Sequence, residues 1–308
     1  MSPLRGLVAD YLRVRRSLGY QLIEHERFLT QFLDYLEQTQ ASTITAENAL
    51  TWAKLPANAN PRWHGARLSA LRGFAAWAQA FDPDIQVPPT GLLPMRTVRA
   101  TPYLYSEDQI RALINAAASL VPEVRSATFR LLIGLLAVTG MRAGEAIRVD
   151  VTDLDLDAGT LTVRGTKFGK TRLLPLHPSV VEELRAYLTL RTGAALPGTT
   201  ALLVSVAGAR LTYDNTHRVF KKLTAQAGIT PRSTACRPRM HDLRHTFAVN
   251  TLLDAYRTSG DVGAWLPLLS TYLGHTEPAN TYWYLHAAPE LMALAADRVN
   301  TRDAESER

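Results

Sequence analysis

The sequence of 308 residues contains a single cysteine, Cys236, which excludes an internal disulfide. It also lacks an uninterrupted run of about 18 apolar residues, the minimum that a membrane-spanning helix needs. The opening segment, MSPLRGLVADYLRVRR, has charges spread along it and so lacks the apolar core of a secretory signal peptide. We expect a cytoplasmic protein that folds without a disulfide framework.

Acidic residues are missing between Asp84 and Glu107. Prolines in this interval keep the chain extended, and Arg96 and Arg99 make it basic. The pattern predicts a basic linker, residues 85–104, between an N-terminal domain, 1–84, and a larger C-terminal domain, 105–308.

Basic residues outnumber acidic residues across the chain, 34 to 28, and the formal net charge is +6. Positive charge favours polyanionic partners such as nucleic acid, but charge alone does not establish one. Apolar residues make up 46% of the sequence, which is enough to build buried cores.

Residues 6–81 have the apolar periodicity of helices, and Thr45 is placed to cap one of them. Two apolar stripes predict the packed core of a helical bundle. The first comprises Phe28, Leu29, Phe32, Leu33 and Leu36, and the second comprises Leu68, Leu71, Phe74, Ala75 and Ala78. The arginines of this region, taken alone, are typical of solvated helix faces: Arg13, Arg15, Arg16, Arg62, Arg67 and Arg72.

The C-terminal domain begins with a helix signal, because Ser106 is a good cap and two acidic residues follow it in the first turn. Residues 127–140 are apolar nearly all round and predict a buried central helix. Alternating residues in 150–165, with a turn at 157–159, predict strands, and helices resume at 177–191. We therefore expect a mainly α-helical protein with a small antiparallel β-sheet.

The segment TLTVRGTKFGKTRLLPL, residues 160–176, contains the Gly-Lys-Thr of a nucleotide-binding phosphate loop. Its two glycines are one position too close for that loop, and a proline follows where the loop should open a helix. Strand-like alternation before the glycines instead predicts a β-hairpin, with Lys167 and Lys170 at or near its tip.

The segment MHDLRHTF places His241 and Arg244 on one helix face, because they are three residues apart. His241 and His245 also imitate the His-Glu-x-x-His pair of zinc proteases. An aspartate replaces the longer glutamate, an arginine lies between the two histidines, and no clear third ligand follows, so a zinc site is disfavoured. His245 is therefore left out of the candidate site.

Three further features complete a set. Arg142 follows a Thr-Gly break in TGMRAGE, His275 lies in a Leu-Gly-His motif, and Tyr284 follows in TYWYL. With the hairpin lysine and the HDLRHTF motif, in this order, they resemble the tyrosine recombinase (phage integrase) family over residues 105 to about 295. The resemblance implies a mixed α+β catalytic domain of that family, and the basic helical N-terminal part resembles the family's core-binding domain.

Position by position, the resemblance implies the catalytic residues Arg142, Lys167, His241, Arg244, His275 and Tyr284, with Glu145 supporting the first arginine. The register of Arg-Leu-Leu-Pro-Leu favours Lys167 over Lys170, and the interval from Leu-Gly-His favours Tyr284 over Tyr282. Candidate DNA-contacting residues are Arg96, Arg99, Lys170, Arg237 and Arg239.

This set is chemically coherent. Two guanidiniums can bracket the non-bridging oxygens of a phosphodiester with charge-assisted hydrogen bonds. A tyrosine hydroxyl, with its ordinary pKa near 10, needs the help of the two histidines to attack phosphorus, and a lysine can protonate the departing 5′-oxygen. The family's 3′-phosphotyrosyl intermediate implies a reaction with no metal, cofactor or ATP.

The resemblance implies a double-stranded DNA site as partner, self-association on that DNA as a dimer or tetramer, and no membrane. Two alternatives remain: a catalytically silent DNA-binding accessory protein of the same fold, and a type IB topoisomerase-like nicking-closing enzyme. The interval from Arg244 to His275 is longer than is common in the family. Its extra residues, in 255–267, are interpreted as a DNA-contacting loop, a contact to a neighbouring protomer or a neutral insertion. Residues 285–299 suit an amphipathic helix that packs on its own domain or on an adjacent protomer.

Overall fold

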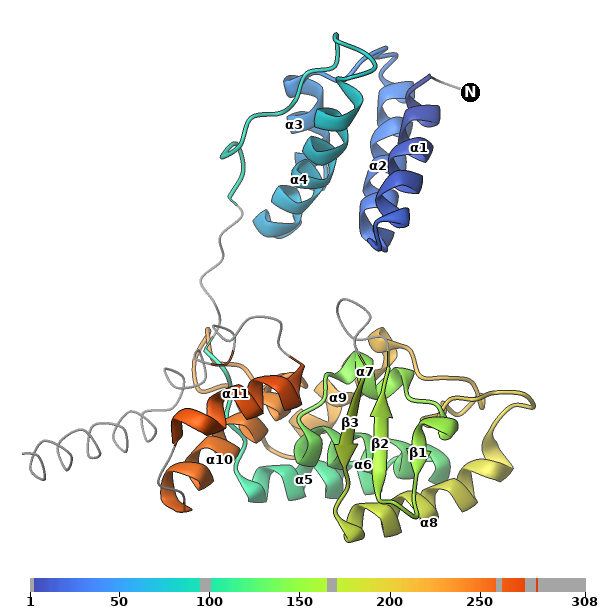
Figure 1. Ribbon diagram of the computed structural model, residues 1–308, viewed down its shortest axis with the longest axis vertical. Coiled ribbons are helices and arrows are strands. Elements are labelled where there is room, and N and C mark those ends of the chain that lie inside the picture. The colour runs from blue at the N-terminus through green and yellow to red at the C-terminus, as the bar shows by residue number, and fades with distance from the viewer. Residues whose placement is uncertain (1–2, 95–100, 165–170, 259–261, 275–280, 282–308) are drawn as a thin grey trace, which may run out of the picture. The chain divides into compact units, whose positions relative to one another are not determined.

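The computed structural model describes residues 3–94, 101–164, 171–258, 262–274 and 281. The chain divides into two compact units, Met1–Arg99 and Ala100–Arg308 (Figure 1). No helix in the described ranges is long and apolar enough to cross a membrane. The assignment of 1–84, 85–104 and 105–308 to a DNA-binding domain, a linker and a catalytic domain stays a prediction.

The first unit holds α1 (Pro3–Ser17), α2 (Ile23–Gln38), α3 (Ala46–Lys54) and α4 (Pro61–Ala78). The predicted cap is confirmed, since the side chain of Thr45 accepts a hydrogen bond from the backbone N–H of Asn48. Every residue of the two predicted apolar stripes is buried, and these stripes from α2 and α4 form the centre of the core.

Two of the arginines that were expected on solvated faces are not there. Arg67 is only 5% exposed, and its guanidinium stacks over the ring of Trp52 at 3.8 Å. Arg72 donates to the backbone oxygens of Pro88 and Pro89, at 2.7 Å each, and so holds the chain that follows α4. Their partners lie far along the sequence, which is why helical periodicity alone placed them wrongly.

Segment 85–104 is packed at both of its described ends. Ile85 is fully buried in the core of the first unit, and the backbone N–H of Gln86 donates to Ile44 O at 2.8 Å. Tyr103 is 2% exposed within the core of the second unit. Each unit therefore fixes a short part of this basic segment.

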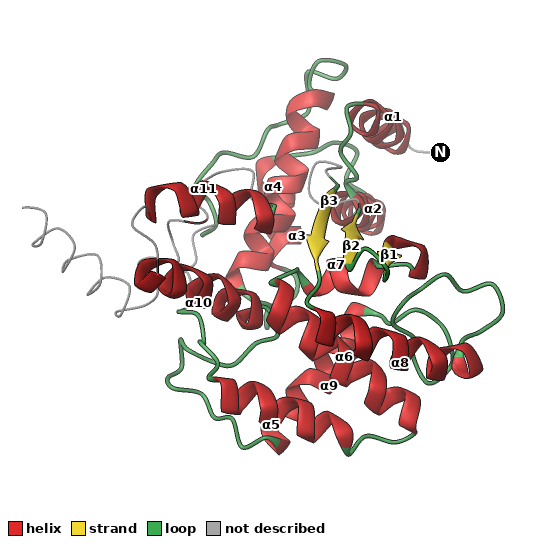
Figure 2. Ribbon diagram, turned by 60° about the horizontal axis from the view of Figure 1, so that its bottom comes forward, coloured by secondary structure: helices red, strands yellow, loops and turns green. Residues whose placement is uncertain are grey.

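The second unit begins with α5 (Glu107–Ala118), where Ser106 caps the helix as predicted by accepting from the N–H of Gln109. The apolar helix α6 (Glu123–Thr139) follows and contacts α5, α8 (Pro178–Ala194) and α10 (Asp242–Thr258) (Figure 2). Its central residues Leu132 and Ile133 are fully inaccessible to solvent, which confirms the prediction of a buried central helix.

The short helix α7 (Ala143–Arg148) and the 3₁₀ turn η1 (Val151–Asp153) lead into a three-stranded antiparallel sheet. Its strands are β1 (Leu154–Asp155), β2 (Thr160–Val163) and β3 (Arg172–Pro175), in the order β1-β2-β3. The last register pair before the loop of the β2–β3 hairpin joins Val163 to Arg172. Figure 1 shows α7 beside the edge where β2 ends and β3 begins. The expected fold, mainly helical with a small antiparallel sheet, is confirmed.

Helix α9 (Tyr213–Gln226) contacts α5 and α7, and α10 packs side by side with α11 (Val262–Leu273) (Figure 2). Leu252 and Leu269 are buried between the last two helices. The extra residues 255–267 lie in these helices wherever the structure describes them, so the interpretation as a loop is wrong for that part.

Candidate active site

The site begins at a sharp turn between α6 and α7. Gly140 ends α6 with a left-handed backbone, φ +60°, and a Cβ atom there would lie 2.3 Å from Cδ1 of Phe247. Both the conformation and the space therefore require glycine. The turn makes Arg142 the residue that precedes the first turn of α7, with its side chain 33% exposed.

Glu145 anchors this turn with a carboxylate that is buried at 2% side-chain exposure. Arg142 donates to it twice, from its backbone N at 2.9 Å and from Nη1 at 2.8 Å. Arg172, the first residue of β3, donates from Nη2 at 2.7 Å and from Nη1 at 3.3 Å. Burial acts to raise the pKa of Glu145, but the hydrogen bonds from Arg172 and Arg142 outweigh it and lower the pKa from its ordinary value of 4.5 to about 2.

Arg244 connects three motifs that lie far apart in the sequence. It is in the first turn of α10, is 2% exposed, and donates from Nη1 to Gly140 O at 2.9 Å and from Nη2 to Leu273 O at 2.8 Å. Gly140 belongs to the Arg142 turn, and Leu273 is the first residue of the Leu-Gly-His motif. A buried guanidinium needs such acceptors, because an unpaired buried charge is strongly destabilising.

His241 immediately precedes α10 and is exposed, although neighbouring atoms crowd its ring. This desolvation, with the positive charges of Arg244, Arg142 and Arg239, lowers the pKa of His241 from 6.5 to about 4. The ring centroid of His245 lies 4.7 Å away in an edge-on contact. His241 is therefore a neutral imidazole at pH 7 beside a cluster of cations.

Arg239 and Asp242 form a bidentate ion pair at the start of α10. Arg239 donates from Nη2 at 2.8 Å and from Nε at 3.0 Å, and the Asp242 side chain is fully buried. Arg237, by contrast, is exposed and donates from Nε to Thr234 O at 3.2 Å. Within the described ranges, no three His, Cys, Asp or Glu side chains come together as metal ligands.

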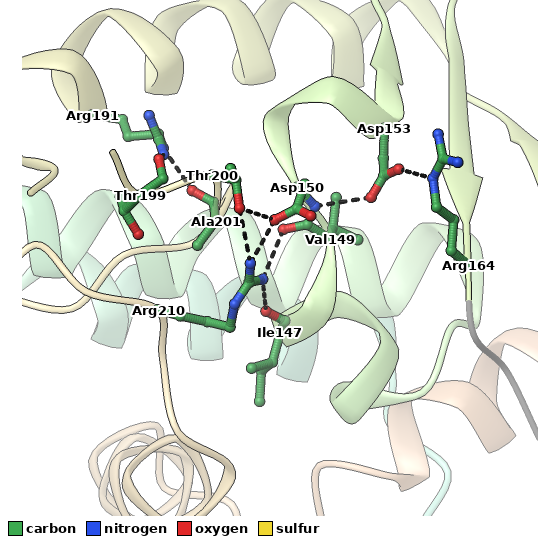
Figure 3. Close-up of polar contacts among 10 residues, drawn as sticks. All are labelled: Ile147, Val149, Asp150, Asp153, Arg164, Arg191, Thr199, Thr200, Ala201 and Arg210. Atoms are coloured by element: carbon green, nitrogen blue, oxygen red, sulfur yellow. Dashed lines mark hydrogen bonds and ion pairs between the residues drawn. The ribbon is translucent and has the colours of Figure 1, made fainter. Parts of the chain in front are cut away.

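A polar network fixes the far end of α7 and the end of β2 that leads into the hairpin loop (Figure 3). Arg210 donates to the backbone oxygens of Ile147 and Val149, at 2.9 and 3.2 Å, and also pairs with Asp150. Arg164, next to the hairpin loop, pairs with the buried carboxylate of Asp153. This network holds the helix that follows Arg142 in register with the sheet.

The structure thus brings together four of the predicted site residues: Arg142, Glu145, His241 and Arg244. Six others fall outside the described residues, namely Arg96, Arg99, Lys167, Lys170, His275 and Tyr284. Two described residues border these undescribed segments: Arg172 follows the lysine segment, and Gly274 directly precedes His275.

The sequence motifs used Arg172 only to set a register and did not reveal its contact with Glu145. A charged residue opening an apolar strand was the available signal.

Comparison with known proteins accounts for this arrangement. Residues 104–290 match the model of the phage integrase family. The chain is 44% identical over 309 aligned positions to a protein of Sinorhizobium fredii (strain NBRC 101917 / NGR234) that carries the name integrase/recombinase y4rB, with 98% of each chain covered. It is 29% identical to the tyrosine recombinase XerC of Azotobacter vinelandii, covering 95% of this chain and 94% of that protein.

Solved structures show the same fold. The XerA recombinase matches with a TM-score of 0.51 and 24% identity, covering 96% of this chain and 98% of that one. The Tn1549 transposon integrase matches with a TM-score of 0.64 and 18% identity, covering 97% and 100%. The chain also contains the Arg142 turn, the helix that begins within HDLRHTF and the small sheet. Together with these features, the sequence matches show that the chain belongs to the phage integrase family of site-specific tyrosine recombinases.

Proposed function

We propose that this recombinase cleaves and rejoins duplex DNA at a specific site through a covalent bond between Tyr284 and a DNA 3′-phosphate. The observation that carries the proposal is the position of Arg244, which donates to Gly140 O and Leu273 O. This single side chain joins the turn of Arg142 to Leu273, which lies two residues before His275 in the sequence. Such convergence is what a phosphate-binding site requires of residues from three separate segments.

The two arginines have distinct roles in the proposal. Within its guanidinium, Arg142 donates to Glu145 from Nη1, and among the described residues no partner contacts its Nε or Nη2. These groups are available to a non-bridging phosphate oxygen. Arg244 is fixed by hydrogen bonds to two backbone oxygens, so its charge holds one position and needs no reorganisation during the reaction.

The proton transfers follow from the residue types. The Tyr284 oxygen bonds to phosphorus as the bond from phosphorus to the 5′-oxygen breaks, and Lys167 supplies the proton that this oxygen takes up. Desolvation and the nearby arginines lower the pKa of His241 and make it a weak base in the free protein, and the negative charge of a bound phosphate offsets those arginines, so that its neutral imidazole can accept the proton of the tyrosine. His275 is a second hydrogen-bonding group for the phosphate. A 5′-hydroxyl from another strand then attacks the phosphotyrosine and reverses the step.

The partner is double-stranded DNA, contacted by both units, and the protein acts in the cytoplasm. Support comes from neighbours of like fold, among them XerH bound to a palindromic difH substrate and a lambda integrase tetramer bound to a Holliday junction. We therefore also propose a dimer or tetramer on DNA. Arg96, Arg99, Lys170 and Arg237 are the proposed phosphate contacts, and Arg239 is better suited to holding Asp242.

A nicked suicide DNA substrate tests the proposal, because loss of the short 5′-hydroxyl fragment traps the covalent intermediate. Wild-type protein should form an adduct that protease digestion reduces to a peptide on the DNA 3′ end. Tyr284→Phe should form none, and the matched control Tyr282→Phe should form it. An undiminished adduct with Tyr284→Phe, or none with wild type, would overturn the proposal.

Strand exchange separates the recombinase from its two alternatives. A silent accessory protein binds DNA but forms no adduct, and a topoisomerase-like enzyme forms the adduct but only relaxes supercoils. The proposed enzyme should join strands from two differently labelled duplexes that carry the trapped sequence. Adduct formation with relaxation but without joined products would favour the topoisomerase-like alternative.

A further inference from the structure

Arg172 is nearly buried, at 11% side-chain exposure, and its guanidinium lies fork to fork with the Glu145 carboxylate. Nη1 and Nη2 each approach a different carboxylate oxygen, which is the bidentate geometry that only arginine provides. Arg142 donates to the same two oxygens from the other side. Glu145 therefore accepts four hydrogen bonds, which fill the capacity of an ionised carboxylate.

The charges of this group do not cancel. One carboxylate is shared by two guanidiniums, so the three side chains carry a net charge of +1. Without Arg172, the carboxylate of Glu145 and the guanidinium of Arg142 would form a neutral pair. That pair would hold Arg142 more tightly and leave less positive potential for a phosphate. Arg172 supplies the second cation at a place where solvent scarcely screens it.

Arg172 also borders the turn after α11. Gly274 has φ +68°, and a Cβ atom there would lie 3.1 Å from Arg172 Nη1 and 3.6 Å from its Cζ. The guanidinium is thus packed against the backbone of the residue that follows Leu273, whose oxygen accepts from Arg244. Arg172 and Arg244 thus adjoin two consecutive residues of this turn. Among the described residues, Arg172 Nε has no hydrogen-bond partner.

We propose that Arg172 is a positioning residue that keeps the charge of Arg142 available to the scissile phosphate, by sharing Glu145 with it and by bracing the turn at Gly274. This inference rests on the proposed function, because it assigns the phosphate to Arg142. Arg172 acts through Glu145 and the turn and does not itself touch the DNA.

A neutral phosphate analogue tests the inference. A methylphosphonate at the scissile position replaces one non-bridging oxygen with a methyl group and removes its negative charge, so an enzyme needs its arginine cations less. Single-turnover adduct formation should be measured on phosphodiester and methylphosphonate suicide substrates. The proteins are wild type, Arg172→Met, Arg142→Ala and the control Arg111→Met, whose arginine pairs with two exposed carboxylates of its own helix.

On the phosphodiester, Arg172→Met should cut about 10- to 100-fold more slowly than wild type, a smaller loss than removal of a direct donor can cause. We call the ratio of the wild-type rate to the variant rate the gap. On the methylphosphonate, this gap should be about tenfold smaller than on the phosphodiester for both Arg172→Met and Arg142→Ala. Arg111→Met should match wild type on both. Wild-type rates for Arg172→Met on the phosphodiester, or an equal gap on both substrates, would overturn the inference.

The Arg142→Ala measurements separate this inference from the proposed function. If the gap of Arg142→Ala does not shrink, the assignment of the phosphate to Arg142 is wrong. If it shrinks while that of Arg172→Met does not, only the inference about Arg172 is wrong. Circular dichroism and DNA binding report the folding of each variant. Should Arg172→Met fail to fold, Arg172→Lys, which keeps the charge but not the fork, carries the same comparison with a smaller gap.

Discussion

Arg239 forms a two-point ion pair with Asp242, and the carboxylate in this pair has no contact with solvent. The backbone N–H of Arg239 donates to the same carboxylate at 3.0 Å, so Asp242 closes the loop that leads into α10. An arginine that sequence reasoning assigned to DNA thus has a structural partner within the chain. Removing it leaves a buried charge without its counter-ion.

We expect Arg239→Met to lower the free energy of unfolding by about 2 kcal/mol, below the 3–5 kcal/mol typical of fully buried pairs, because the arginine is 41% exposed. Urea denaturation followed by circular dichroism measures the loss. Arg239→Met combined with Asp242→Asn should recover part of it, because the buried charge is gone. If Arg239→Met were as stable as wild type but bound DNA more weakly, Arg239 would be a DNA-contacting residue after all.

Glu145 should make stability depend on pH in the acid range. Its pKa is about 2 in the folded protein against an ordinary 4.5, so the unfolded chain takes up a proton first as the pH falls. The contribution is complete above pH 4.5 and is lost between pH 4.5 and 2. A shift of this size corresponds to about 3 kcal/mol. Urea denaturation at pH 5 and pH 3 should show the part of this loss that falls between those two values, about 2 kcal/mol, in wild type. In Glu145→Gln, the drop over the same interval should be smaller by about that amount.

His241 should remain a neutral imidazole well below pH 6.5. Its lowered pKa, about 4, means that the unfolded chain binds a proton more readily, so this histidine reduces stability as the pH falls from 6.5 to 4. NMR of protein with labelled histidine, assigned by loss of a signal in His241→Gln, follows the titration directly. A midpoint near 6.5 would show that neither desolvation nor the surrounding arginines lower the pKa of this ring.

Arg244→Lys should lose at least about 100-fold in the rate of adduct formation. A single ammonium cannot reproduce the two separate donors that reach Gly140 O and Leu273 O, and it presents no fork to a phosphate. The matched control is Arg218→Lys, at an exposed position of α9. Cleavage by Arg244→Lys within a few-fold of wild type would argue against the bracketing of the phosphate.

Gly140→Ala should lower the free energy of unfolding by about 2–4 kcal/mol, from the left-handed backbone and the clash with Phe247 together. Gly134→Ala, in the middle of α6 with open space at its Cβ, is the control and should be neutral or stabilising by up to about 1 kcal/mol. Thermal unfolding compares the two variants. Equal melting temperatures would show that the turn adjusts at little cost.

Much of the fold could be predicted because its signals are local. Helix caps at Thr45 and Ser106, and apolar faces such as that of α2, depend on residues within a few positions of one another. Arg67 and Arg172 were not predicted in their true settings, since their partners Trp52 and Glu145 lie in other elements. An arginine with an apolar stem looks alike in sequence whether it is solvated, stacked or paired in a core.

The site shows the same division. The motifs identified Arg142, His241 and Arg244 through the spacing of residue types, and the structure brings these three together. What spacing did not indicate is how Arg244 is held, because its acceptors are backbone oxygens, which every residue carries. Nor does spacing show that Glu145 serves two arginines, since β3 meets α7 only after folding.

Because the oxygens that hold Arg244 belong to the main chain, this contact depends on the path of the backbone and not on which side chains flank it. Mutational tolerance should therefore be uneven across the site. At Leu273, substitutions that keep helix α11 in place leave the acceptor intact. At Glu145, one atom's difference in the side chain removes a charge that two arginines share. Leu273 is itself buried, at 1% exposure, in the core between α10 and α11. A saturation library scored for DNA cleavage should therefore accept other apolar residues that fit this core at Leu273 and almost no replacement at Glu145.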